Sequence, residues 1–126
     1  MSPGRLIKEG TAMVMAPVRF TMEWIAPLAE TSSIHTALQG LIVLTRAEPG
    51  CIGCSLSTRM TERAGFSYEE TWKTEEDLKR QLRSSRFARL MQLAERATER
   101  PSIQFELPGG TRGLDYAEEV GRVEPT

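Results

Sequence analysis

The sequence predicts an α+β fold of the ferredoxin-like type, with the element order β-α-β-β-α-β and an antiparallel sheet that carries its helices on one face. Two observations support this prediction. Four short segments alternate apolar and polar residues as strands do, and the longer segments between them repeat apolar residues every three or four positions as helices do. The 126 residues suffice for one domain with a core of its own.

The first part of the chain is predicted to contain an arm, a strand and a helix. Residues 1–16 show little periodicity and are predicted to be an N-terminal arm of the domain at 17–108. Residues 18–25 alternate strictly, which predicts a strand that ends at Pro27. A helix follows, since apolar residues recur at helical spacing until Pro49 and Gly50 stop it. Gly40 weakens this helix by roughly 1 kcal/mol relative to Ala.

The second part is predicted to contain a hairpin, a broken helix and a last strand. Residues 52–58 and 66–72 alternate on either side of a polar turn, which favours an antiparallel hairpin. Thr74 is a good N-cap for a helix, and Ser84 or Ser85 can cap a further helical segment. Residues 102–107 are predicted to form the fourth strand, and residues 109–126 a tail that packs on a dimer partner.

The composition excludes several functional classes. The net charge is −1 and the basic residues are scattered, so the sequence lacks the cluster of basic residues that is typical of a nucleic-acid-binding protein. No apolar run approaches the roughly 20 residues of a membrane-spanning helix. Two cysteines do not make a disulfide scaffold. We therefore expect a cytoplasmic protein with neither nucleic-acid nor membrane partners. Because the second face of the sheet also carries apolar residues, we expect a homodimer to cover it.

The two cysteines form a Cys51-x-x-Cys54 motif that enters the second strand. Residues three apart in a regular strand point to opposite faces, so the two thiols cannot bridge. A zinc site needs about four ligands, and the single histidine, His35, is predicted to be exposed. We interpret both cysteines as packing residues and expect no metal.

Three short motifs resemble the antibiotic-biosynthesis monooxygenase (ABM) family of dimeric α+β barrels. They are PGCIG at 49–53, ETWKTEE at 70–76 and SSRF at 84–87, and the resemblance spans about residues 18–107. The chain departs from the family pattern at three positions. Cys54 replaces an aromatic residue, Tyr68 an asparagine of the quinol-oxidising members, and Arg86 a common histidine. Met91 stands where the haem-degrading members carry their axial histidine.

The resemblance implies a cavity between sheet and helices that binds a small aromatic or quinol-type molecule. There the substrate anion would itself reduce oxygen, with no metal, flavin or other cofactor. The implied catalytic residues are Trp72, Glu70 and Tyr68. Two of them have a structural alternative: Trp72 as a core residue, and Glu70 as an acceptor for a neighbouring arginine. The implied substrate-binding residues are Trp24, Met22, Arg86, Phe87 and Met91.

The roles of Trp24, Met22 and Arg86 stay open in the sequence. Trp24 and Met22 line either the cavity or the dimer face, and Arg86 either holds an acidic substrate or lies on a solvated helix face. The alternative to an enzyme is a non-catalytic small-molecule-binding or accessory protein with the same dimeric fold. A third hypothesis is an interaction module that uses the tail at Leu114 and Tyr116.

Overall fold

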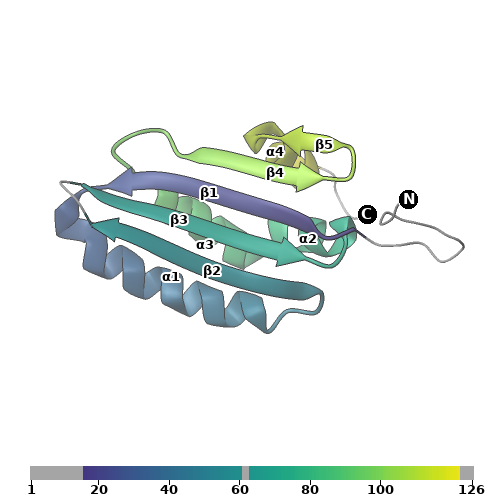
Figure 1. The fold of residues 1–126 in the computed structure, drawn as a ribbon, viewed down its shortest axis with the longest axis horizontal. Coiled ribbons are helices and arrows are strands. Elements are labelled where there is room, and N and C mark those ends of the chain that lie inside the picture. The colour runs from purple at the N-terminus through teal and green to yellow at the C-terminus, as the bar shows by residue number, and fades with distance from the viewer. Residues whose placement is uncertain (1–15, 61–62, 123–126) are drawn as a thin grey trace, which may run out of the picture.

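The structure is a computed structural model that describes residues 16–60 and 63–122. Its centre is a five-stranded sheet in the order β2-β3-β1-β4-β5, in which every neighbouring pair is antiparallel (Figure 1). The strands are β1 Val18–Ala26, β2 Cys51–Met60, β3 Ala64–Trp72, β4 Ser102–Leu107 and β5 Gly110–Arg112. The first four have the ferredoxin-like order, so the predicted fold class is confirmed. The sheet is open, with β2 and β5 at its edges.

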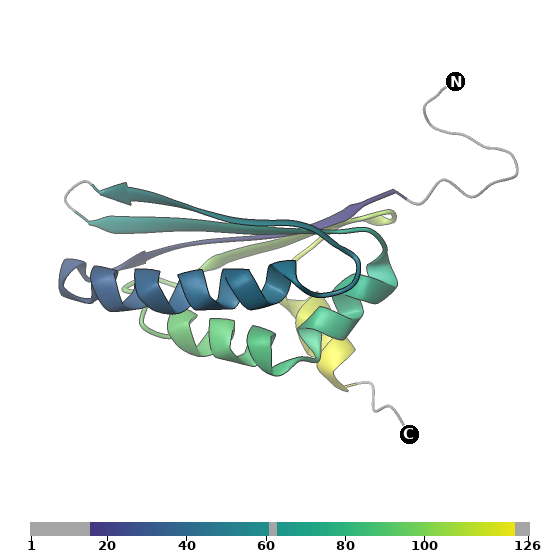
Figure 2. The ribbon, with the colours of Figure 1, turned by 90° about the horizontal axis from the view of Figure 1, so that it is seen from below.

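All the helices lie against the same face of the sheet (Figure 2). A short 3₁₀ turn, η1 Leu28–Glu30, leads into α1 Thr31–Arg46, and the second helical region is divided into α2 Glu75–Leu82 and α3 Ser85–Ala94. The predicted caps explain the division. The Thr74 hydroxyl accepts from the Asp77 N–H, and the Ser84 hydroxyl accepts from the Phe87 N–H, so each helix has its own N-cap.

The turn between α1 and β2 requires glycine at position 50. Gly50 has φ +87°, a left-handed conformation that other residues adopt at a cost. A Cβ atom at this position would overlap the carboxylate of Asp77. Gly40, in contrast, has nothing within 4 Å of the place where a Cβ would lie. A glycine inside a helix can allow another element to pack closely against it, but no element of the described residues packs closely at Gly40.

The segment after β4 forms regular structure, which differs from the predicted tail. A tight turn leads into β5, and α4 Leu114–Arg122 then folds back against the helical layer of its own chain. Tyr116, Ala117 and Val120 supply the reason, because their helical spacing gives α4 one buried face. The packing of this segment on a dimer partner stays a prediction.

A β-bulge at the start of β2 corrects the prediction for the two cysteines. Cys51 pairs with Trp72 and Cys54 pairs with Glu70, because the register shifts between Cys51 and Gly53. Residues 70 and 72 of β3 share one face, so both cysteines lie on the helix-facing side of the sheet. The inserted residue, Ile52, is 55% exposed. Both thiols are free.

The face of the sheet away from the helices is mainly polar. Arg19, on the middle strand β1, forms ion pairs with Glu69 of β3, at 2.9 Å, and with Glu106 of β4, at 4.0 Å. The apolar residues from which we inferred a covering partner are few, since Ile25 is half-buried and Ile52 belongs to the bulge. A homodimer through this face stays a prediction, and its contact would be largely polar.

Candidate functional site

The three residues implied as catalytic lie next to each other on β3. Tyr68, Glu70 and Trp72 alternate toward the helices, and each is at most 1% exposed. Strand periodicity alone places them on one face, so their proximity follows from the sequence. The structure adds what these side chains contact.

Glu70 accepts three hydrogen bonds at its buried carboxylate. The Tyr68 hydroxyl donates to Oε2 at 2.6 Å, and the Trp72 indole N–H donates to Oε1 at 2.9 Å. The side-chain amide of Gln81, from α2, donates to Oε2 at 3.2 Å. A buried carboxylate is tolerated only when its oxygens find donors, and here both oxygens have them.

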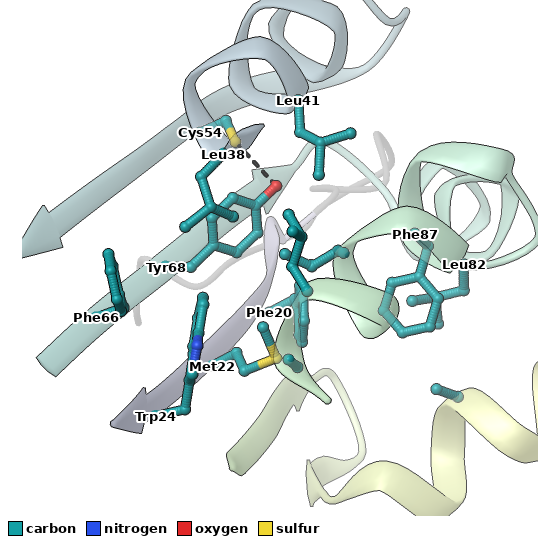
Figure 3. Close-up of a cluster of buried hydrophobic side chains, with 14 of the residues drawn as sticks. Phe20, Met22, Trp24, Leu38, Leu41, Cys54, Phe66, Tyr68, Leu82 and Phe87 are labelled. Carbon is teal, nitrogen blue, oxygen red and sulfur yellow. Dashed lines mark hydrogen bonds between the residues drawn. The ribbon is translucent and has the colours of Figure 1, made fainter. Parts of the chain in front are cut away.

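The network continues beyond the carboxylate in two directions. On one side the Cys54 thiol donates to the Tyr68 oxygen at 3.2 Å, the dashed line in Figure 3. On the other side the same Gln81 amide nitrogen reaches the Thr45 hydroxyl at 3.3 Å. The Gln81 carbonyl oxygen accepts from Arg86 Nε at 2.9 Å. Gln81 therefore joins α1, α2, α3 and β3 through a single amide.

Arg86 forms the partly exposed end of this network. Its terminal Nη2 lies 3.3 Å from the carboxylate of Glu48, and the two side chains are 21% and 33% exposed. The solvated helix face that was one alternative for Arg86 is therefore wrong for this side chain, since its Nε contacts a buried residue. Arg86 therefore pairs with the charge of Glu48 at the protein surface and donates a hydrogen bond to Gln81 in the interior.

Burial sets the protonation of these groups. Desolvation raises the pKa of the Glu70 carboxyl, although the hydrogen bonds from Tyr68, Trp72 and Gln81 and the charge of Arg86 lower it again in part. Burial likewise raises the pKa of the Cys54 thiol to about 12 and that of the Tyr68 phenol well above its usual range. At neutral pH the thiol and the phenol therefore keep their protons and act as hydrogen-bond donors.

Four of the five residues implied as substrate-binding make no hydrogen bond to the Glu70 network. Met22 and Trp24 are buried on β1, where Trp24 stacks on Phe66 with 5.3 Å between ring centroids (Figure 3). Phe87 of α3 faces Phe20 at 5.8 Å rather than Tyr68. Met91 is half-buried on the same helix. Of the implied set, Arg86 alone joins the polar network.

Four members of the network were missed by reasoning from the sequence: Thr45, Glu48, Gln81 and, as a hydrogen-bond donor, Cys54. Gln81 carried a signal that could have revealed it. It stands three residues after Leu78 and one before Leu82, inside the apolar stripe of α2. A polar residue at such a position faces the core and needs a buried partner.

Two cavities formed by the described residues lie apart from the Glu70 network. One, of about 430 Å³, lies between α2, the β4–β5 turn and α4. The other, of about 490 Å³, lies at the far end of the sheet near Gly65 and Trp24. Neither is lined by Tyr68, Glu70 or Trp72. The cavity that the resemblance implies beside Trp72 thus stays a prediction, and substrate would reach it only after side chains move.

Residues 16–60 and 63–122 hold no group of three His, Cys, Asp or Glu side chains placed to share a metal ion. Within the same ranges, every helix is too short or too polar to cross a membrane.

Comparison with solved structures identifies the fold. A conserved protein from Methanosarcina mazei has a TM-score of 0.66 and 21% identity, with 75% of this chain and 94% of that chain covered. A candidate antibiotic biosynthesis monooxygenase from Caulobacter crescentus has a TM-score of 0.64 and 16% identity, covering 73% and 89%. A second such candidate, from Nitrosomonas europaea, has a TM-score of 0.63 and 13% identity, covering 77% and 88%.

No family model and no curated protein matches the sequence. The likeness to solved structures therefore establishes that the chain has an ABM-like fold, and its activity must be inferred from the site.

Proposed function

We propose that the protein is a cofactor-independent monooxygenase that acts on a small aromatic or quinol-type substrate. Glu70 is the general base, and Tyr68 and Trp72 orient the reacting oxygen. The observation that carries the proposal is the Tyr68–Glu70 contact, in which a buried carboxylate holds a phenolic O–H at 2.6 Å. A substrate phenol would offer Glu70 the same group.

The buried environment of Glu70 suits the first step of such a reaction. A carboxylate whose pKa is raised by desolvation is a stronger base than an exposed one, so it accepts a phenolic proton more readily. The phenolate then transfers one electron to O₂, giving a phenoxyl radical, or a semiquinone radical where the substrate is a hydroquinone, and superoxide. The two radicals combine to form a C–O bond, and the resulting peroxide anion takes the proton back from Glu70. Loss of water from the hydroperoxide then leaves a quinone. One oxygen atom enters the product and the other leaves as water.

The route to Glu70 is proposed to open at Arg86. Tyr68, Glu70 and Trp72 are shielded from solvent, whereas Arg86 is partly exposed at the junction of α2 and α3. Displacement of the Gln81 side chain would connect this point to the carboxylate, since Gln81 lies between the two. Arg86 would then attract an anionic group of the substrate.

Oxygen uptake with a panel of hydroquinones and anthrones tests the proposal. The wild-type protein should consume O₂, and Glu70→Gln should lower the rate by about 10² to 10⁴, the usual contribution of a general base. Trp72→Phe should also lower it. The matched control is Glu69→Gln, on the same strand but paired with Arg19 on the opposite face, which should leave the rate unchanged. Absence of uptake with every compound in the panel would end the proposal.

The second candidate is a non-catalytic small-molecule-binding or accessory protein of the same fold. It is favoured by the completeness of the network, in which the three side chains on β3 use the protein's own groups as partners. A polar cluster of this kind can have a purely structural role, which is to fix the helices on the sheet. A compound that raises the melting temperature but causes no oxygen uptake would select this candidate over the enzyme.

A further inference from the structure

We infer that the cavity between α2 and α4 is a binding site for a small organic anion, such as an aromatic carboxylate, distinct from the Glu70 network. Its volume of about 430 Å³ is within the range of small-molecule sites, which is roughly 300–1,000 Å³. The floor is apolar, formed by Leu107, Tyr116 and Val120, and the last two are 4% exposed.

The walls of the cavity are held in place by hydrogen bonds at both ends of α4. At its start, the Tyr116 hydroxyl donates to Oε2 of Glu75 at 2.7 Å. Near its end, Arg83 Nε donates to the carbonyl oxygen of Val120 at 3.2 Å. These two contacts fix α4 against α2, so the space between them is part of the fold rather than a gap between mobile segments.

Both carboxylates of the lining are already engaged by the lining itself. Glu75 accepts from Tyr116, and Glu119 accepts from Arg112 at 3.2 Å. Arg112 is committed as well, since it also donates to Asp115 at 2.8 Å and lies over the Tyr116 ring at 5.5 Å. These three side chains therefore hold the walls of the cavity together and have little remaining capacity to form hydrogen bonds with a ligand.

Two cations keep unused donors: Lys79 of α2, and Arg83, which directly follows the last residue of that helix. The terminal nitrogens of Arg83 donate to no group in residues 16–60 and 63–122, because its one side-chain bond uses Nε. Lys79, one helical turn earlier, is 3.7 Å from Glu76, which is itself 80% exposed. Residues four apart share a helix face, so both cations border the same cavity. Two cations beside an apolar floor are suited to a ligand that has an anionic group attached to an apolar body.

The opposite rim leaves room for such a ligand to enter. Gly109 and Gly110 form this rim, and neither would bring a Cβ within 4 Å of another atom. The ligand can therefore place its apolar body on Tyr116 and Val120 and its charge at Lys79 and Arg83.

Titration of the ¹⁵N-labelled full chain with sodium benzoate, followed by amide chemical shifts, tests the inference. We expect shifts confined to α2, the β4–β5 turn and α4, with a dissociation constant of about 1 mM, equivalent to about −4 kcal/mol. Lys79→Gln and Arg83→Ala should each weaken binding by about fivefold, as expected for one partly exposed ion pair. The control, Arg89→Ala, changes an exposed cation of α3 outside the cavity and should have no effect.

Two further probes decide the chemistry. Benzamide has the shape of benzoate without its charge, and inorganic phosphate has charge without an apolar body. Equal affinity for benzamide would overturn the role of the cations, and equal affinity for phosphate would overturn the role of the floor. Shifts outside α2, the β4–β5 turn and α4, or no shifts at all, would overturn the site itself. Because Arg83 also holds α4, Lys79→Gln remains decisive if Arg83→Ala unfolds.

Discussion

Tyr68→Phe removes one oxygen atom from the centre of the buried network and changes nothing else in shape. The lost atom donates to Glu70 at 2.6 Å and accepts from Cys54 at 3.2 Å. Glu70 keeps two donors, Trp72 and Gln81, but loses the nearest one. A hydrogen bond to a charged group contributes about 1.5–3 kcal/mol, and one between neutral groups about 1 kcal/mol. We therefore expect Tyr68→Phe to lower the free energy of unfolding by about 2–3 kcal/mol when Glu70 is ionised.

The loss should depend on pH, and its sign follows from the direction of the pKa shift. Burial raises the pKa of Glu70 in the folded protein, so the folded state binds its proton more tightly than the unfolded state does. The stability that this proton contributes is complete below the unfolded pKa of about 4.3 and is lost as pH rises through the folded pKa. The Tyr68 bond lowers that folded pKa, so Tyr68→Phe raises it further. The gap in stability between the two proteins should therefore widen with increasing pH.

Urea denaturation between pH 5 and pH 9 measures both effects. Tyr116→Phe is the matched control, because it deletes the other phenolic oxygen, which bonds the partly buried Glu75 at 2.7 Å. Glu75 is a charged partner but is only partly buried, so the loss should be about 1.5 kcal/mol, the lower end of the range for a hydrogen bond to a charged group. If Tyr68→Phe were as stable as the wild type at every pH, the network would not stabilise the fold. A constant loss from pH 5 to pH 9 would show that Glu70 does not titrate in that range.

Three more changes test other parts of the structure. Gln81→Leu leaves several polar partners without a hydrogen bond, so it should lower the free energy of unfolding by about 2–3 kcal/mol, as measured by urea denaturation. An unchanged free energy of unfolding would contradict the role of its amide in joining the helices to β3. Gly50→Ala should destabilise by more than about 1 kcal/mol because of its positive φ, whereas Gly40→Ala, in open space, should stabilise by up to about 1 kcal/mol. The pKa of Cys54 is raised to about 12, so Ellman's reagent should label it only on unfolding, after the half-buried Cys51; rapid labelling of Cys54 in the native protein would contradict its burial.

The elements that alternate or repeat strictly were predictable from the sequence. β1 and β3 fall within one or two residues of the predicted strands, because their inner positions are apolar or aromatic with the single exception of Glu70. The caps at Thr74 and Ser84 placed the start of α2 and α3, since a hydroxyl before a helical stripe has a defined hydrogen-bonding role.

What the sequence concealed depends on partners far apart in the chain. The bulge at Ile52 arises from the pairing of β2 with β3, and no residue in 51–54 identifies it alone. The contact between Gln81 and Glu70 likewise requires α2 to pack at one particular height on β3. The segment after Leu107 was misjudged because two glycines suggested a break, whereas they form the turn into β5.

The contact between Cys54 and Tyr68 couples two residues that lie diagonal to each other across the β2–β3 pair. A larger residue at 54 would need space that the phenol occupies, and a smaller residue at 68 would leave a void beside the thiol. The two positions should therefore tolerate substitution together better than one at a time. A double-mutant cycle that combines Cys54→Phe with Tyr68→Asn should give a smaller loss in the free energy of unfolding than the sum of the two single losses.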